Sequence, residues 1–505
     1  MSEDNEVNED NNEDNNEDNN EDNKDNWFRK SDIETRTTSE AEYIVSQFRQ
    51  QEKSTAIGYV RGEDGGIAYM FVKGRFLARE QYLGGPPPPG AEGIKRPRGI
   101  FDVLRDAHLD LDLQAIDVRR VIGDVVLLTI PGASDVSDDN PLSVPSLLER
   151  FDAELGIGVA TPDHVLTVSG VMGPCPATEP QEVYGPWRPY PAECRGDGGA
   201  GVRIYVADTG LIAGAKDTFP WLEDVDGELD PRSGPGNAIG HYDGHGTFVA
   251  GVLRCVAPKA KIYVANVFDI AGSMVESDIG LKLGSALAHG DEIIHMTIAS
   301  PSRKNVPMMA VEAWLKHLLP GYKGVVCIAA AGNNGNQLPC WPGAFPEVIS
   351  VGALATDWDS RAYFSNFGSW VDVYAPGQDL INAFGSGKYK CVIAPYTGEE
   401  RRFYGMAQWS GTSFSTPIVT GLIAARMSRS GESAQEAAAA LLAEARAQAI
   451  PGVGPVLFPY CDDDLPRRGR RGHGCACGHG CGCGHDGGCG HDGGCRHGKH
   501  GLKPR

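Results

Sequence analysis

Three short stretches of this sequence place an acid, a base and a nucleophile at the edges of apolar runs. VRIYVADTG ends on Asp208, DGHGTFVAGV carries His245 before an apolar run, and GTSFSTPIVTGLIAARM carries Ser413. A serine hydroxyl is a weak nucleophile unless an imidazole takes its proton and a carboxylate holds that imidazole in the right tautomer. The three residues therefore predict acyl transfer through a covalent intermediate on Ser413.

Each of these residues also has an ordinary structural interpretation. Asp208 alone is typical of a turn after a strand, whereas His245 and Ser413 alone are typical of helix starts. A further polar residue, Asn333, alone is typical of a turn. Their joint occurrence favours the catalytic interpretation over four separate structural ones.

The chain from Gly201 onward alternates short apolar strands with helical stretches. The predicted strands are VRIYVAD, KIYVANVFD, EIIHMTIAS, GVVCIAAAGN, EVISVGA and WVDVYAPG, and the predicted helices are HGTFVAGVLRCV, ESDIGLKLGSALAHG, VPMMAVEAWLKHLL and SAQEAAAALLAEARAQAI. Nearly all-apolar strands are typical of a parallel sheet covered on both faces. We therefore predict an α/β, doubly wound, mainly parallel sheet, with the active residues at the carboxyl ends of its strands.

The motifs and their order resemble the subtilisin family of serine endopeptidases, from about Val202 to Met427. The triad order Asp, His, Ser is the order known for subtilisin. Ala-Ala-Gly-Asn at 330–333 is similar to the family's oxyanion-hole segment, and Trp341-Pro342-Gly343 resembles its cis-proline segment. SNFGSWVDVYAPG at 365–377 resembles the strand before the nucleophile helix.

The resemblance implies a serine endopeptidase that hydrolyses polypeptides and needs no cofactor for catalysis. Asp208 would orient His245, and the Asn333 side chain with the Ser413 backbone N–H would hold the oxyanion. The family's substrate-pairing strand corresponds to the residues Thr297, Ile298, Ala299 and Ser300, although the family often has Gly at the last two positions. Gly-Thr-Ser-Phe-Ser at 411–415 lacks the second Gly of a lipase-type elbow.

Two features depart from the simple family pattern. The insertion LINAFGSGKYKCVIAPYTGEERRFYGMAQW at 380–409 predicts an extra hairpin beside the cleft, which leaves the substrate range open. No complete calcium loop is recognisable, so a calcium ion stays open without assignable ligands. Asp224, Asp226 and Asp230 are either ligands or, as we favour, solvated turn residues.

The segments outside the peptidase domain at 200–458 divide by composition. Residues 1–39 are acidic and Asn-rich and are predicted to be disordered, and residues 40–117 have no clear pattern apart from a Pro-rich break. A small β-α-β module at 118–170 occupies the place of the family's inhibitory prodomain, with the linker 171–199 after it. This position implies autocleavage in the linker, while a permanent accessory domain is the alternative.

The tail at 459–505 is rich in Gly, Cys and His, with a six-residue repeat. Its density of ligands favours zinc or another thiophilic metal, although the spacing is not that of a zinc finger. The candidate ligands are Cys477, Cys483, Cys489, Cys495, His479, His485 and His491. A low-complexity tail from repeat expansion is the alternative interpretation.

Composition excludes some partners. The net charge of −21 argues against nucleic acid, and no apolar run approaches the ~20 residues of a membrane span. The acidic N-terminus lacks the features of a secretory signal, so we expect a cytoplasmic protein, with export by an unseen route left open. Most of the body cysteines are expected to be reduced, and Cys175 and Cys194 are the candidates for a disulfide.

Two other functions remain open at this point. One is a catalytically silent peptide-binding scaffold on a protease fold. The other is a metal-handling protein that acts through its Cys/His tail.

Overall fold

The computed structural model describes residues 18–459 apart from 52–55, 63–65, 85–96, 134–136, 138–139, 169–176, 185–187, 195, 235 and 237. Residues 18–33 are described by their backbone alone. All described residues belong to one compact unit. No helix among them is both long enough and apolar enough to cross a membrane.

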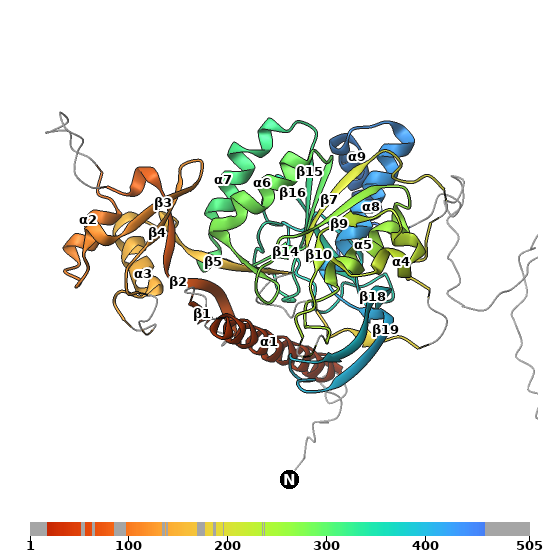
Figure 1. Ribbon diagram of the computed structural model, residues 1–505, viewed down its shortest axis with the longest axis horizontal. Helices are drawn as coiled ribbons and strands as arrows, with labels where there is room; N and C mark the ends of the chain where they lie inside the picture. The colour runs from red at the N-terminus through yellow and green to blue at the C-terminus, as the bar shows by residue number, and fades with distance from the viewer. Residues whose placement is uncertain are drawn as a thin grey trace, which may run out of the picture. The chain divides into compact units, whose positions relative to one another are not determined.

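A parallel sheet lies at the centre of the described chain, seven strands wide in the order β17-β16-β15-β13-β7-β11-β9 (Figure 1). Its strands are β7 (Arg203–Asp208), β9 (Asp226–Gly227), β11 (Lys261–Asn266), β13 (Ile293–Met296), β15 (Val326–Ala330), β16 (Val348–Leu354) and β17 (Val373–Pro376). The predicted doubly wound α/β sheet is confirmed.

Helices cover both faces of this sheet because alternate residues of its strands point to opposite sides. On β7, Ile204 and Val206 join one apolar cluster and Tyr205 and Ala207 join another. The first cluster contains residues of α5 (His245–Val256), α8 (Thr412–Ser430) and α9 (Ala434–Ala447), and the second contains residues of α6 (Ile279–His289) and α7 (Met309–His317).

The N-terminal module, which we define as residues 57–168, is an antiparallel sheet with two helices. It contains β1 (Ile57–Arg61), β2 (Ile67–Arg79), α2 (Ile100–Asp106), β3 (Asp117–Ile122), β4 (Val125–Thr129), α3 (Val144–Leu155) and β5 (Ala160–Val168). The expected β-α-β unit at 118–170 is thus only part of the sheet, since β2 lies between β4 and β5. The sequence signal of β2 is weak because apolar residues fill both of its faces.

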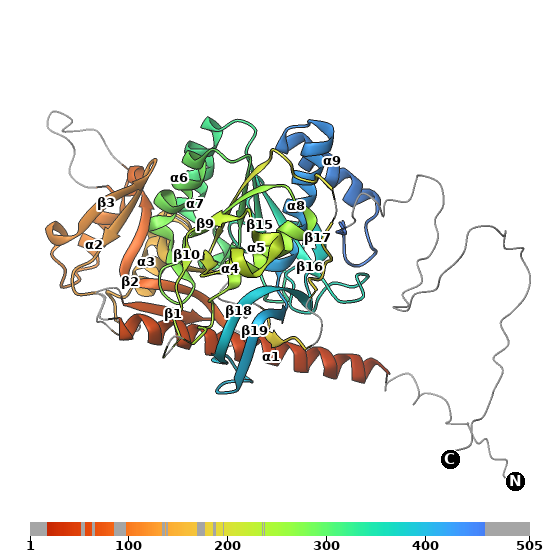
Figure 2. The ribbon, with the colours of Figure 1, turned by 45° about the vertical axis from the view of Figure 1, so that its right-hand side comes forward.

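A long helix, α1 (Asp18–Gln50), precedes the module where disorder was expected over 1–39. Ala41, Ile44, Val45 and Phe48 recur at helical spacing and form a buried stripe that packs against β1 and β2. Figure 2 shows α1 running from the module to the strands β18 and β19. The apolar stripe lies beyond the Asn-rich repeat, so the composition of the repeat did not reveal it.

A long hairpin and several short elements complete the fold around the sheet. The predicted extra hairpin is formed by β18 (Leu380–Lys390) and β19 (Glu400–Trp409), and β6 (Gln181–Glu182) pairs with β19. Part of the expected linker 171–199 is therefore built into the peptidase domain. The remaining short elements are α4 (Ala215–Thr218), β8 (Leu211–Ile212), β10 (Leu229–Asp230), β12 (Ser273–Val275) and β14 (Ile298–Ala299).

Candidate active site

The predicted catalytic residues lie at element ends on the carboxyl side of the central sheet. Asp208 is the last residue of β7, and Asn333 follows β15 by three residues. His245 is the first residue of α5, and Ser413 is the second residue of α8. All four side chains are fully buried in this structure. Ligand and catalytic sites of open α/β sheets are usually found at this edge.

Asp208 and His245 form a hydrogen-bonded pair. The imidazole Nδ1 lies 2.8 Å from one carboxylate oxygen of Asp208 and 3.0 Å from the other. The same carboxylate accepts hydrogen bonds from the Thr297 hydroxyl at 2.7 Å and from the Thr209 backbone N–H at 2.7 Å. Burial acts to raise the pKa of Asp208, but the charge of His245 and these hydrogen bonds outweigh it and lower the pKa. Asp208 therefore stays ionised.

The other nitrogen of His245, Nε2, is the one left to act as a hydrogen-bond acceptor. Because Nδ1 donates to Asp208, Nε2 of the neutral ring holds a lone pair. Nε2 has no hydrogen-bond partner among the described residues. The ring lies 5.2 Å from the ring of Phe414, the neighbour of Ser413. The His245 ring is therefore oriented by Asp208 and held against the first turn of α8.

The orientation of Asn333 is set from the nucleophile helix. Its amide oxygen accepts from both the backbone N–H and the hydroxyl of Thr412, each at 2.9 Å. The Thr412 hydroxyl in turn accepts from the Gly332 N–H at 3.1 Å. Since the amide oxygen faces Thr412, the amide nitrogen faces the other way as a donor. This orientation suits the predicted oxyanion-hole role.

The predicted substrate-pairing residues flank this site. Ile298 and Ala299 form β14, Thr297 joins it to Asp208, and the Ser300 N–H donates to the Trp341 carbonyl at 2.8 Å. The peptide bond between Trp341 and Pro342 is cis, as the resemblance implied. All four strand residues are buried, because β14 already pairs with β5 of the N-terminal module.

Sequence reasoning missed several supporting residues. Thr297 was predicted only as a substrate contact, and Thr209, Thr412 and Asp230 were assigned no part in the site. Each of the three threonines is a neighbour of a predicted residue in the chain or at the next strand end, which was the available signal. Asp230 lacked even that, because it lies on another strand.

Asp230 corrects one of our expectations. Asp224 and Asp226 have side chains that are 76% and 80% exposed, as solvated turn residues should be. Asp230, however, is only 6% exposed and accepts hydrogen bonds from the site. Within the described residues, no group of three or more His, Cys, Asp or Glu is placed to hold a metal ion.

The remaining candidate metal ligands are in the tail and lie outside the described residues, as does Cys175. Cys194 is disulfide-bonded. The four free cysteines that the structure does describe are all buried: Cys255, Cys327, Cys340 and Cys391.

The fold and the site together define an α/β protein in which a hydrogen-bonded Asp208–His245 pair lies against the first turn of the helix that carries Ser413. Residues 199–480 match the model of the subtilase family. The chain therefore belongs to the subtilase family.

Two named serine proteinase relatives agree with this assignment, and one solved structure resembles part of the chain. A thermophilic serine proteinase from Bacillus sp. (strain AK1) is 31% identical over 278 residues, which cover 52% of this chain and 60% of that protein. Thermitase from Thermoactinomyces vulgaris is 30% identical over 271 residues, covering 51% of this chain and 84% of thermitase. A solved structure of a cold adapted subtilisin-like serine proteinase covers 54% of this chain and 93% of its own, at 24% identity and a TM-score of 0.40.

Proposed function

We propose that the protein is a serine endopeptidase that cleaves peptide bonds through an acyl-enzyme on Ser413. The observation that carries the proposal is the 2.8 Å contact between Asp208 and Nδ1 of His245, which leaves Nε2 as the base beside α8. Family membership supports the reaction class, and the geometry supports the residue roles.

The chemistry follows from these positions. Nε2 of His245 takes the hydroxyl proton as Oγ of Ser413 bonds to the peptide carbonyl carbon, and the carbonyl electrons move onto its oxygen. Asn333 and the Ser413 N–H stabilise that oxyanion. When the tetrahedral intermediate collapses, His245 gives the proton to the departing amine. Water then repeats the sequence and releases the acyl group.

The test is labelling of the purified protein with a fluorophosphonate probe, alongside digestion of casein. Wild type should be labelled and Ser413→Ala should not. Ser415→Ala is the matched control, since this buried serine lies two residues further along the same helix. If wild type is not labelled even after limited proteolysis, the enzyme proposal fails and the peptide-binding scaffold gains support.

We also propose that the N-terminal module is an inhibitory prodomain. Its strand β5 lies between β12 and β14 and pairs antiparallel with both, with Thr167 opposite Ser273 on one side and Ala299 on the other. Since Ile298 and Ala299 are the predicted substrate-pairing residues, β5 fills the position that an extended substrate would take.

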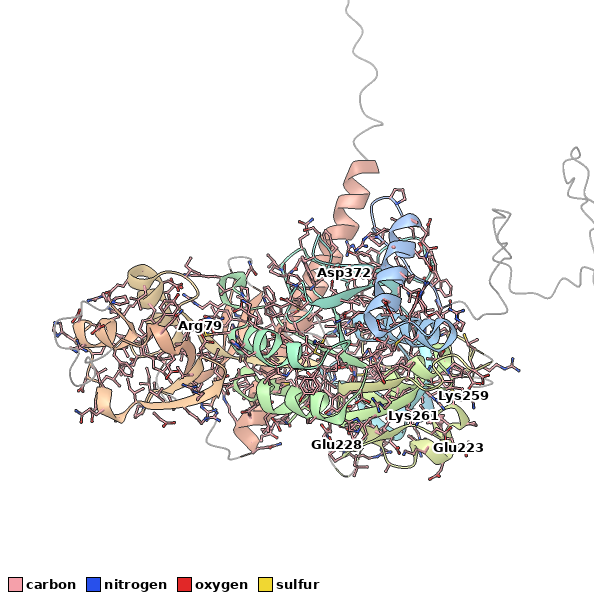
Figure 3. The ribbon with its side chains drawn as sticks, turned by 90° about the horizontal axis from the view of Figure 1, so that it is seen from above. Arg79, Glu223, Glu228, Lys259, Lys261 and Asp372 are labelled. Carbon is pink, nitrogen blue, oxygen red and sulfur yellow. The ribbon has the colours of Figure 1, made fainter. Side chains whose placement is uncertain are left out.

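Polar contacts tie the module to the peptidase domain elsewhere. Arg303, which is 5% exposed, forms ion pairs with Glu149 at 2.5 Å and Asp152 at 2.8 Å. His164 of β5 lies 2.6 Å from Glu276, and both are buried. A further ion pair joins the module to α7 through Arg79, which Figure 3 labels at the boundary between the two parts. A loosely attached domain would not bury charged groups in this way.

Cleavage is expected between Val168 and Ala177. The chain before this interval is held in β5, whereas Ala177 is fully buried in the peptidase domain and Gln181–Glu182 forms β6. This narrows the interval expected from sequence, 171–199, to its first part. Amino-terminal sequencing of wild type should find a new terminus in the interval, and Ser413→Ala should remain one chain. A single active wild-type chain would instead establish a permanent accessory domain.

A further inference from the structure

Asp230 is a buried carboxylate beside the catalytic pair with no role in the triad. It ends β10, which pairs in parallel with β8 just after the turn that follows Asp208. Only 6% of the residue is exposed. A carboxylate so buried normally has partners that repay its loss of hydration.

Those partners are the Gly244 N–H and the Thr209 hydroxyl. One oxygen of Asp230 accepts from the Gly244 N–H at 2.7 Å and from the Thr209 hydroxyl at 2.9 Å. The Thr209 hydroxyl in turn accepts from the Gly246 N–H at 3.0 Å. Asp230 thus reaches the residue before His245 directly and the residue after it through one hydroxyl.

Both flanking residues are glycines that cannot fix the loop by themselves. Gly244 is the N-cap of helix α5 with φ 85°, a conformation that favours glycine, and it provides no side-chain cap. A Cβ on Gly246 would lie 2.4 Å from the Gly210 carbonyl oxygen, so a side chain is excluded there. The start of α5 therefore takes its support from outside the helix.

Thr209 extends the same chain of contacts to the catalytic acid. Its backbone N–H donates to Asp208 while its hydroxyl donates to Asp230. Asp208 and His245 come from different elements, and hydrogen bonds through Thr209 and Gly244 therefore tie the positions of both to Asp230.

We propose that Asp230 is a positioning residue that fixes the His245 imidazole. It accepts a hydrogen bond from the Gly244 N–H directly, and it reaches the Gly246 N–H through the Thr209 hydroxyl. The proposal rests on the endopeptidase function proposed above. It assigns Asp230 no contact with substrate.

The acceptor role does not require a negative charge. Burial raises the pKa of Asp230 well above its usual value, and the nearby charges of Asp243 and Asp208 act in the same direction. The hydrogen bonds from Gly244 and Thr209 act against them. The carbonyl oxygen of a neutral carboxyl or of an amide accepts the same two hydrogen bonds. An asparagine at position 230 should therefore preserve the positioning of His245.

The test compares Asp230→Ala, Asp230→Asn and Thr209→Val. The first should lower kcat about ten- to hundredfold with KM changed by less than about threefold, since misplacing a catalytic group by ~1 Å costs about 10²-fold. Asp230→Asn should retain kcat within about threefold of wild type, and Thr209→Val should lose activity through the Gly246 link. Asp226→Ala is the control, as an exposed aspartate of the neighbouring β9.

A second readout does not depend on turnover. The low-field proton resonance of His245 Nδ1–H should shift or broaden in Asp230→Ala and in Thr209→Val, but not in Asp230→Asn. An inactive wild type would count against the endopeptidase, while this resonance would still test Asp230.

Two results would overturn the proposal. One is an Asp230→Ala variant with wild-type kcat and an unchanged His245 resonance, whatever its melting temperature. The other is an Asp230→Asn variant as impaired as Asp230→Ala. If Asp230→Ala fails to fold, the Asn and Thr209 variants decide in the same way.

Discussion

At the scale of single residues, Thr412 couples Asn333, the proposed oxyanion donor, to Ser413, the proposed nucleophile. It precedes Ser413 in α8 and holds the Asn333 amide through its hydroxyl and its backbone N–H. Any shift of the nucleophile turn should therefore shift the donor with it, which preserves their spacing.

Replacing Asn333 with Ala should lower kcat by roughly 10²- to 10³-fold, the cost of removing one oxyanion-hole donor in subtilisin itself. KM should change little, because the donor acts on charge that develops in the transition state. Steady-state hydrolysis of a peptide amide measures both constants. Asn336→Ala, in the same loop, is the control, and equal losses in the two variants would contradict the role of Asn333.

The sequence was sufficient to propose the reacting residues and insufficient to identify the residues that hold them in place. Asp208, His245, Asn333 and Ser413 occur in motifs with fixed local order, so they were predictable. The support from Asp230 depends on the pairing of β10 with β8, which brings together residues 21 positions apart. No local pattern records such a contact.

At the scale of elements, the capping of α9 can be separated from catalysis. Ser433 and Glu436 form a reciprocal capping box at the start of this helix. Replacing Ser433 with Ala should lower the free energy of unfolding by about 1 kcal/mol and leave kcat unchanged. Denaturant unfolding in a Ser413→Ala background avoids self-digestion. A change in kcat without a change in stability would contradict this separation.

The regular elements of the peptidase domain were easier to predict than those before it. The strand β7 and the helix α5 are continuous apolar runs in a repeating order. By contrast, β2 pairs with β4 and β5, whose residues lie at least 46 positions away from Arg79. Non-local pairing of this kind leaves little trace in a local pattern.

At the scale of the whole molecule, the docking of the module should weaken as pH rises. Asp163 of β5 accepts hydrogen bonds from the backbone N–H and the hydroxyl of Ser277 in the peptidase domain. Burial raises the pKa of Asp163 to about 6. The stability that this protonated carboxyl adds to the docked module is fully present below its solution pKa of 3.8 and is lost as pH rises through about 6. Hydrogen bonds from Lys304 and Arg303 lower the pKa of Glu149. The stability that Glu149 adds to docking is therefore lost only below the pH range in which Asp163 titrates.

Release of the cleaved module, followed by gel filtration, should therefore be faster at pH 8 than at pH 5. Asp163→Asn should remove most of this dependence, because the amide stays neutral over the whole range. Equal release of the wild-type module at both pH values would rule out Asp163 as its source.

Helix α1 should contribute separately to holding the module. Its Glu40 is fully buried and accepts from the Tyr242 hydroxyl at 2.8 Å, three residues before His245. Glu40→Ala should speed module release, since the lost contact belongs to the docked state. Glu42→Ala, whose side chain is 61% exposed on the same helix, is the control. Identical release rates for the two variants would remove α1 from the interaction.

The attachment of the module at both β5 and α1 has a kinetic consequence. Once the chain is cut after β5, the module is a bivalent ligand held by β5 and α1. When one of these two contacts dissociates, the other keeps the module at a high local concentration. Rebinding is then faster than escape, so a single processing cut need not produce free enzyme. A second cut between Gln50 and Ile57 would separate α1 from β5 and leave each segment to dissociate alone. Activation would then require two cleavages, with a lag before proteolysis begins.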